Sequence, residues 1–334
     1  KIYTIDLHGN SNKQEKSPDG SIDVNVFDIQ QGVSINLFVK TGNKKLGEIG
    51  KVFHYDLYGK REFKYGFLSD NKLNQISFRE LDVISPNYSF VLRNLEKLKI
   101  YENGFSALEI FSINSIGIVT SKDEILINNS EDDLIKNVSE YYSINSEISL
   151  VKKISYRPFD TKFIYYDVKL IERAREKVMR HFLRGENLGL ITARSNKSET
   201  CDHFFISKNV METKCGERTT QSAIFPLYLY PDTNGQQSAF ETAERVPNLN
   251  MEIVNEIAKS LGLQFVTEKT EGNVCMANNS EVRNDFRTTF APIDLLDYIY
   301  AVLHSPKYRE KYKEFLKIDF PRVPYPKDQK TFFD

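Results

Sequence analysis

The stretch from Ala291 to Pro326 constrains the fold most, because it predicts two consecutive helices with clear ends. Pro292 suits the first position of a helix, and apolar residues then recur at helical spacing as far as Leu303. Ser305 suits the N-cap and Pro306 the first residue of a second helix, which a proline-rich tail ends. Because the first helix is apolar almost all round, we expect it to lie inside the protein. The sequence therefore predicts a helical hairpin that closes a core.

Upstream, the order of elements predicts a mixed α and β fold, with strands in the middle and helices at the end. Lys1 to Leu7 predicts a short strand, and Val24 to Lys40 predicts two more, interrupted at a Gln-Gln-Gly turn. These strands at the start of the chain need further strands to pair with, and no strand precedes them in the sequence. We therefore expect the tail of a sheet whose body lies upstream. The aromatic pattern from Gly47 to Leu68 favours two strands around a turn.

The second half of the chain carries stronger signals. Helices are expected after Ser130, from Glu172 to Leu183 and from Asn248 to Leu261. Strands are expected on both sides of a turn at residues 157–160, and at Asn187–Thr192, His203–Ile206 and Ala223–Tyr230.

Composition limits the class of protein. A chain of 334 residues that is 40% hydrophobic and 27% charged can build compact domains with real cores. No apolar run approaches the ~20 residues that span a bilayer. Signal-peptide features are missing at Lys1, and the absent initiator Met suggests a cropped or processed chain. Cys201, Cys215 and Cys275 are odd in number and lack CxxC spacing, so we expect no zinc site and a reducing, cytoplasmic location.

Charge changes sign between neighbouring segments. Residues 101–150 carry a net charge of −7, and residues 152–200 carry +6. A basic face of this kind can bind nucleic acid, although solvated faces give the same pattern.

Two polar loops next to apolar strands are candidates for contact with DNA. One loop follows the strand that ends at Thr192, and the other precedes the strand that starts at Ala223. Their Arg, Ser, Thr and Gln side chains are the types that contact base edges and phosphates. The predicted DNA-binding residues in the loops, the turn and the helix are Arg157, Arg173, Arg175, Arg180, Arg194, Ser195, Lys197, Arg218, Thr220 and Gln221.

Common catalytic motifs are absent. The sequence has no GxGxxG, GxxxxGK[ST], HExxH or GxSxG, and its five histidines are scattered. A metal-dependent nuclease of the PD…ExK type would need Asp19 with Glu62 and Lys64, but the interval is long and Asp19 belongs to a turn. We therefore predict no catalytic, cofactor-binding or metal-binding residues.

Several segments resemble one family in the same order. They are Ile2–Asn10, Asn25–Lys40, His54–Glu62, Asn114–Thr120, Tyr156–Tyr166, Phe225–Tyr230, Leu296–Arg309 and Asp319–Pro324. Together they resemble the bacterial restriction-modification enzymes that fuse an adenine methyltransferase to a target recognition domain, the type ISP and type IIG group. No single segment is decisive, but their joint order is specific.

This resemblance implies a division of labour. Residues 1–45 would be the tail of the methyltransferase core sheet, residues 46–150 a connector, and residues 151–334 a β-rich recognition domain that ends in the helical hairpin from about 290. The family's S-adenosylmethionine loop and its Asn-Pro-Pro-Tyr/Phe motif are absent. The resemblance therefore implies a DNA sequence recognition module that binds double-stranded DNA and is inactive alone. The cofactor and the methyltransferase, and any helicase or nuclease domains, would belong to the upstream parent.

Two alternatives stay open at this point. Residues 1–150 could contribute a metal-dependent nuclease site, or the chain could be a structural spacer that docks other domains.

Overall fold

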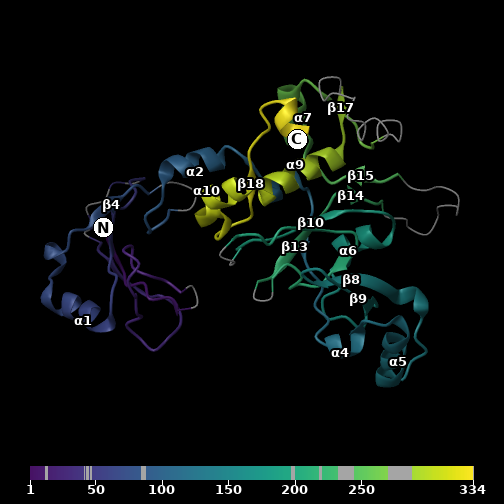
Figure 1. Cartoon of the computed structure of the whole chain (residues 1–334), viewed down its shortest axis with the longest axis horizontal. Helices are drawn as coiled ribbons and strands as arrows, with labels where there is room; N and C mark the ends of the chain where they lie inside the picture. The colour runs from purple at the N-terminus through teal and green to yellow at the C-terminus, as the bar shows by residue number, and fades with distance from the viewer. Residues whose placement is uncertain are drawn as a thin grey trace. The chain divides into compact units, whose positions relative to one another are not determined.

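The computed structural model describes residues 1–11, 14–40, 42, 45, 47–83, 88–196, 200–217, 220–231, 244–269 and 288–333. The chain forms two compact units, Lys1–Leu95 (unit 1) and Glu96–Asp334 (unit 2). Helices and several small sheets follow one another along it (Figure 1), which confirms the predicted mixed α/β class. The finer division at residues 45 and 150 stays a prediction. Among the described residues, no helix has the length and apolar character needed to cross a membrane.

Unit 1 is built on a four-stranded sheet in which the first strand is internal. The strand order is β2 (Ser34–Phe38), β1 (Ile2–Asp6), β3 (Val52–Asp56) and β4 (Arg79–Leu81). β1 pairs antiparallel with β2 and parallel with β3. Both neighbours of β1 thus come from downstream, and the expectation that the body of this sheet lies upstream stays a prediction.

Two expectations for unit 1 are wrong. The first part of the segment from Val24 to Lys40 is a loop, in which the side chain of Asn25 donates to the carbonyl of Gln31 at 2.5 Å and accepts from the amide of Phe27 at 2.9 Å. The expected strand after the glycine turn is helix α1 (Arg61–Asp70), followed by the short 3₁₀ helix η2 (Leu73–Gln75). In a helix, residues four positions apart share one face, and the rings of Phe63 and Phe67 lie 6.5 Å apart on α1. This contact outweighs the preference of aromatic residues for strands.

A buried ion pair ties the loops of unit 1 together. The carboxylate of Asp23 lies 2.8 Å from Lys64 Nζ, and both side chains are fully buried. The same carboxylate accepts from the amides of Gly9 at 2.5 Å and Gly59 at 2.7 Å. Lys64 also donates to two backbone carbonyls. Gly9 is required here, since it has a φ of 77° and a Cβ would lie 2.4 Å from the backbone of Asn25.

The described residues of unit 2 form two larger sheets and three strand pairs. One sheet has the order β11 (Phe205–Ser207), β10 (Gly189–Ala193), β13 (Ser222–Pro226), β6 (Ser115–Ile116). The other has the order β12 (Val210–Met211), β8 (Val151–Arg157), β9 (Asp160–Tyr165), β7 (Ile127–Asn128). The pairs are β14 (Tyr228–Leu229) with β15 (Val246–Pro247), β16 (Gln264–Phe265) with β17 (Thr289–Phe290), and β18 (Arg322–Val323) with β5 (Phe105–Ser106).

The sheet of β10 and β13 separates two hydrophobic cores. Every residue of both strands is buried. Successive side chains point to opposite faces, so Leu190 and Phe225 belong to one core while Ile191 and Ile224 belong to the other. Burial on both faces explains why these strands read in the sequence as continuous apolar runs.

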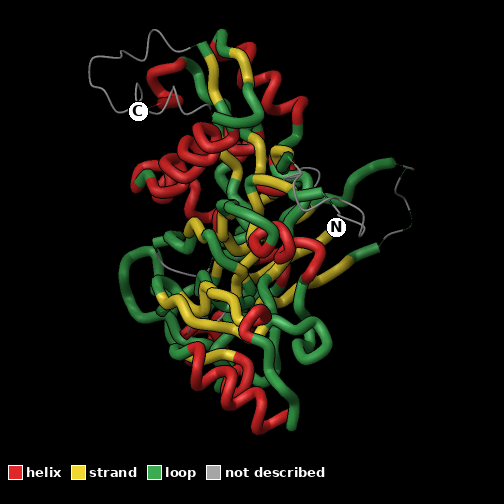
Figure 2. The backbone as a smooth tube through the Cα atoms, turned by 90° about the vertical axis from the view of Figure 1, so that its right-hand side faces the viewer, coloured by secondary structure: helices red, strands yellow, loops and turns green. Residues whose placement is uncertain are grey.

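Helices lie at both ends of unit 2. Figure 1 shows the C-terminal helices α9 (Pro292–His304) and α10 (Pro306–Leu316) on one side of β10 and β13 and helix α5 (Glu131–Tyr142) on the other, and Figure 2 shows the strands between helices from a second direction. Ser305 Oγ accepts from the amide of Tyr308 at 3.4 Å, as expected of an N-cap, which confirms the predicted helical hairpin. The remaining helices are α2 (Leu95–Glu102), α3 (Ala107–Ile110), α4 (Asp123–Leu126), η3 (Ile148–Leu150), α6 (Glu176–Leu183), α7 (Met251–Leu261) and α11 (Gln329–Phe333).

We expect Lys64→Met to destabilise unit 1 by about 3–5 kcal/mol, because it leaves the buried Asp23 carboxylate without its cation. Hydrogen exchange of the β1 and β3 amides measures the effect in this unit alone. The matched control is Asp28→Asn, which removes an exposed ion pair with Arg61 and should leave exchange unchanged. Equal protection in both variants would show that the buried pair does not hold the unit together.

Candidate nucleic-acid interface

The two predicted binding loops leave the central sheet at the same end. β10 and β13 pair antiparallel, and their ladder ends with Ala193 opposite Ser222. Arg194 therefore opens one loop next to the position where Gln221 closes the other. Sequence reasoning placed each loop beside a buried strand, and the register of the sheet brings the two loops together.

The loop after β10 is fixed against the end of α10. Ser195 Oγ donates to the carbonyl of Lys317 at 2.9 Å, which satisfies an acceptor near the C-terminus of the helix. Arg194 Nε lies 3.2 Å from the carboxylate of Asp319, and both side chains are exposed. Because exposed ion pairs contribute little stability, Arg194 can exchange this partner for a phosphate or a base edge. The Ser195 hydroxyl, by contrast, already holds the loop in place.

The described residues of the loop before β13 are held close to the strand. Glu217 and Thr220 form an isolated antiparallel bridge, and Gln221 is exposed. The other two candidates in the loops, Lys197 and Arg218, lie outside the described residues.

Arg157, at the end of β8, is held by a buried carboxylate. Its Nη1 donates to Glu212 at 2.5 Å and to the carbonyl of Tyr156 at 2.6 Å. The guanidinium also lies 3.9 Å from the centroid of the Tyr156 ring. Burial raises the pKa of Glu212, against the lowering effects of the Lys214 amide and the Arg157 charge. Arg157 is therefore oriented in advance, and its remaining donors can face a ligand.

Glu212 also links Arg157 to the loop region. The residue after it, Thr213, accepts through its carbonyl from the amide of Ser222 at 2.7 Å, at the start of β13. Arg157 is thus connected by a short series of contacts to the end of the sheet from which both loops leave.

The remaining candidate arginines lie in α6 or just before it, and two of them are not helical. The expectation that the helix begins at Glu172 is wrong, because α6 begins at Glu176. Arg173 exchanges backbone hydrogen bonds with Val119 at 2.9 and 3.2 Å, and Arg175 has a φ of 56°, so neither can continue a helix. Arg180 lies within α6 as predicted.

Arg173 is separated from the Arg157–Glu212 pair by one extended segment, which contains Ile118 and Val119. Ile118 forms a bridge to Glu212, while its neighbour Val119 forms one to Arg173. Arg173 is exposed and lies 3.5 Å from Glu172, so it carries a weak ion pair on the surface.

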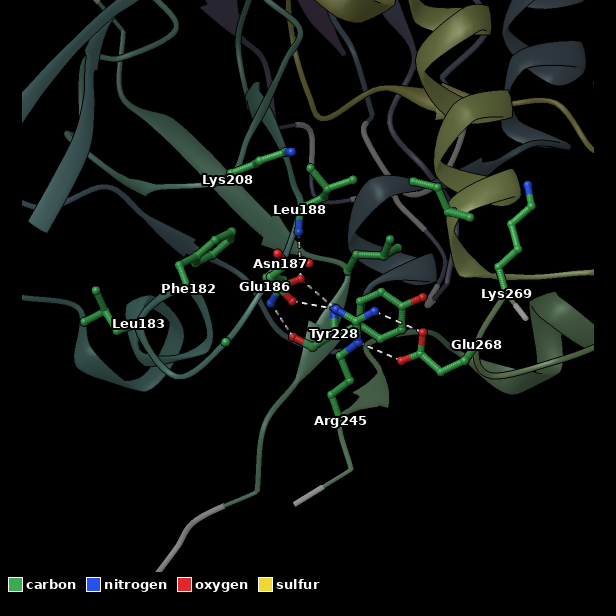
Figure 3. A pocket seen from close by; sticks show the side chains of 13 residues that line it. Phe182, Leu183, Glu186, Asn187, Leu188, Lys208, Tyr228, Arg245, Glu268 and Lys269 are labelled. Carbon is green, nitrogen blue, oxygen red and sulfur yellow. Dashed lines mark hydrogen bonds and ion pairs between the residues drawn. The ribbon is translucent and has the colours of Figure 1, made fainter. Parts of the chain in front are cut away.

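A pocket of about 650 Å³ opens beside the end of α6 and the strand pair β14–β15 (Figure 3). Arg245 stacks 3.9 Å above the Tyr228 ring and bonds Glu268 at 2.6 and 3.0 Å. Arg245 also donates to the carbonyl of Glu186 at 2.5 Å. Burial, and then the charge of Glu268, raises the pKa of Tyr228 to about 12. Since each nitrogen of the Arg245 guanidinium already donates a hydrogen bond within the protein, this cluster connects segments of the chain rather than forming an anion site.

A histidine cluster in unit 1 escaped sequence reasoning, which described the histidines as scattered. His8 Nδ1 lies 2.9 Å from Glu15 and Nε2 lies 2.8 Å from Asp56, which His54 also contacts at 3.1 Å. Among the described residues, Asp6, His8 and Asp56 are the group whose ligand atoms are close enough to hold a metal ion. Ionised carboxylates accept but do not donate, so the contacts to both ring nitrogens are those of a protonated His8. No spacing pattern could have revealed partners this far apart in the chain.

The family of Type ISP C-terminal specificity domains matches residues 142–334. The chain belongs to this family. The match covers more than half of the sequence and includes β8, β9, β10, β13 and both candidate loops. No curated protein matches the chain.

Three solved structures similar to this Type ISP specificity chain contain longer chains in complex with DNA. One is described as a cryo-EM structure of a DrdV–DNA complex, with 20% identity, a TM-score of 0.61, and coverage of 97% of this chain and 33% of that one. A second is the ATP-dependent Type ISP restriction-modification enzyme LlaBIII bound to DNA, at 21% identity and a TM-score of 0.62, over 99% of this chain and 22% of that one. A nuclease-deletion mutant of the Type ISP enzyme LlaGI with a DNA substrate mimic has 18% identity and a TM-score of 0.59, over 99% and 26%. At these identities the likeness establishes the fold, and this chain spans between about a fifth and a third of each relative.

The His8 cluster should make the stability of unit 1 depend on pH. Burial opposes the charge of His8, but hydrogen bonds to Asp56 and Glu15 outweigh it, so the pKa of His8 is raised above its ordinary 6.5. Hydrogen bonds from His54 and His8 hold the pKa of Asp56 well below its ordinary value. The interactions that raise the pKa of His8 stabilise the folded state fully below about pH 6.5. This stabilisation is lost as pH rises through the pKa of His8 in the folded state. The Asp56 contribution is lost only at strongly acidic pH.

We therefore expect unit 1 to become less stable from pH 6 to pH 9, as measured by hydrogen exchange of the β1 amides corrected for the intrinsic rate. His8→Asn should flatten this profile. A profile that is equally steep in the variant would exclude His8 as its cause.

Proposed function

We propose that this chain is the DNA sequence recognition module of a Type ISP restriction-modification protein that methylates adenine at N6. The observation that carries the proposal is the family match over residues 142–334, the part of the chain that presents both polar loops from a doubly buried sheet. The DNA-bound state of the similar structures supports double-stranded DNA as the partner.

The loop geometry suits sequence recognition. A side chain that reads a base edge needs a rigid support and donors or acceptors that are free or weakly paired in the unbound protein. Gln221 is exposed next to the buried strand β13, and Arg194 is exposed next to β10. Arg and Gln pair with guanine and adenine through two hydrogen bonds in the major groove. The basic residues Arg157, Arg173, Arg175 and Arg180 would bind phosphates, which fix the position of the protein without reading sequence.

Catalysis would belong to the parent protein. The chain has no Asn-Pro-Pro-Tyr motif, so S-adenosylmethionine and the catalytic residues would come from the upstream methyltransferase, together with any helicase or nuclease domains. Unit 1 would contribute the last strands of that methyltransferase sheet. The methylated adenine would be flipped out of the duplex. A parent of the type ISP or type IIG kind would work in the bacterial cytoplasm.

A nuclease site in residues 1–150 has little support. Lys64 is fully buried and bonded to Asp23, so it cannot activate a water at a metal.

Phosphate-binding and base-reading residues should respond differently to substitution. We expect Arg180→Ala to weaken binding to all duplexes alike and to reduce the slope of log K against log salt by about one. Gln221→Ala, or Arg218→Ala, should instead cost ~1–3 kcal/mol on the recognised sequence and little on others. The measurement is fluorescence anisotropy with recognised and scrambled duplexes at two salt concentrations, after selection of the recognised sequence from a randomised pool.

Ser195→Ala provides the matched control, because the Ser195 hydroxyl already donates to the carbonyl of Lys317 within the protein. It should lower stability, while the preference set by Gln221 in the other loop stays the same. Binding that survives the loss of Arg157, Arg180, Arg194, Arg218 and Gln221 together would favour a spacer that docks other domains.

We also expect the chain alone to show no saturable binding of S-adenosylmethionine in calorimetry and no methyl transfer to DNA, since the family's cofactor loop is missing. Joining the chain to its upstream methyltransferase should restore both activities. Saturable binding by the chain alone would contradict this assignment.

A further inference from the structure

Phe159 lies at the tip of the β8–β9 hairpin, and its side chain is almost entirely exposed. The hairpin ladder ends with Arg157 opposite Asp160, so Pro158 and Phe159 form a two-residue turn. Phe159 is 97% exposed, the highest value among the exposed large hydrophobic residues that the structure describes. Its φ is 60°, in the left-handed region.

The fold gains little from a phenylalanine at this position. A positive φ is natural for glycine or asparagine in a turn and costs other residues roughly 1–3 kcal/mol. Burial usually offsets such strain for an apolar residue, but here the side chain is almost fully exposed, and its ring makes a T-shaped contact with Phe205, with centroids 5.4 Å apart. Glycine would therefore suit the turn better, and the use of the ring has to be sought outside the chain.

The base of the hairpin is rigid. The Arg157 guanidinium and Lys162 Nζ lie 3.9 and 4.4 Å from the centroid of the Tyr156 ring. Tyr156 donates to Asp123 at 2.9 Å, and Arg157 bonds Glu212. These contacts join the tip to the hydrophobic core, so a force on Phe159 is transmitted to the body of unit 2.

The surface beside Phe159 combines apolar and basic residues. A pocket of about 500 Å³ adjoins the tip, and its lining includes the apolar Phe205 and Ile206 as well as Ser155, Thr161 and the exposed Lys153 and Lys208. The Glu212 charge is neutralised by Arg157, and Asp160 faces Lys162 at 3.9 Å. An exposed ring that shares a pocket with lysines and hydroxyl-bearing residues suits the bases and phosphates of DNA.

We infer that Phe159 is a wedge that inserts against the base stack of bound DNA, with Lys153 and Lys208 contacting the phosphates on either side. The inference rests on the proposed function and adds a mode of contact to it. Aromatic side chains that stack on bases act on any sequence, because every base has a π face. The wedge would thus bend or unstack the duplex, while the loops at β10 and β13 read the sequence.

The absence of tryptophan in the chain provides a direct test. Phe159→Trp introduces a single tryptophan at the tip, and stacking on bases should quench most of its fluorescence during titration with a 20-bp duplex of randomised sequence at low salt. Tyr141→Trp is the matched control, because Tyr141 is also an exposed aromatic residue but belongs to the acidic helix α5. Its fluorescence should change little.

Phe159→Gly separates a binding role from a structural one. It should weaken binding to the same duplex about tenfold or more, while the melting temperature of the protein stays equal or rises because glycine tolerates the positive φ. A lower melting temperature, an unquenched tryptophan at position 159, or unchanged affinity of the glycine variant would each overturn the wedge. No binding by the unsubstituted chain would overturn the proposed function itself, and the wedge with it.

Discussion

Unit 2 depends on hydrogen bonds that let β13 end inside the protein. Beyond the sheet, backbone groups in a dry interior need partners, and two fully or nearly buried asparagine side chains supply them. Asn248 Nδ2 donates to the carbonyls of Ile113 at 2.8 Å and Pro226 at 2.7 Å, and its Oδ1 accepts from the Ile113 amide. Asn187 bonds both the amide and the carbonyl of Tyr228, at 3.1 and 2.8 Å. An aliphatic residue at either position would leave several buried polar groups unpaired.

These amides fix one end of the sheet, and the candidate DNA contacts occupy the other. Between them, β10 and β13 carry side chains into two cores at once, so the strands cannot shift without disturbing both. The loops that begin at Arg194 and end at Gln221 therefore start from fixed positions. Polar side chains on short loops of this kind can change in sequence without cost to the core, which is the property that a specificity domain requires.

Sequence reasoning succeeded where a signal is local. Ser305 and Pro306 mark a helix start by their own chemistry, and the double burial of β13 is visible as an apolar run. It failed where a distant partner decides the outcome. The helix that contains Lys64 is stabilised by the ion pair with Asp23 and by its aromatic face. The backbone of Arg173 pairs with Val119, so α6 begins only after this bridge. His8 and Asp56 are neighbours only because β1 and β3 pair in parallel. Nothing in the spacing of these residues carries that information.

The residues with positive φ differ in whether internal hydrogen bonds compensate the backbone strain. Arg175 has a φ of 56°, and its carbonyl accepts from the amides of Val178 and Met179, which starts α6. Ser143, at 53°, ends α5 with a backbone hydrogen bond to Ser139, and His8, at 49°, contacts carboxylates through both ring nitrogens. In each case the left-handed conformation brings polar groups to internal partners. Phe159 has the same backbone conformation but exposes its ring to water. A strained backbone whose side chain is neither buried nor hydrogen-bonded within the protein indicates a function in contact with another molecule.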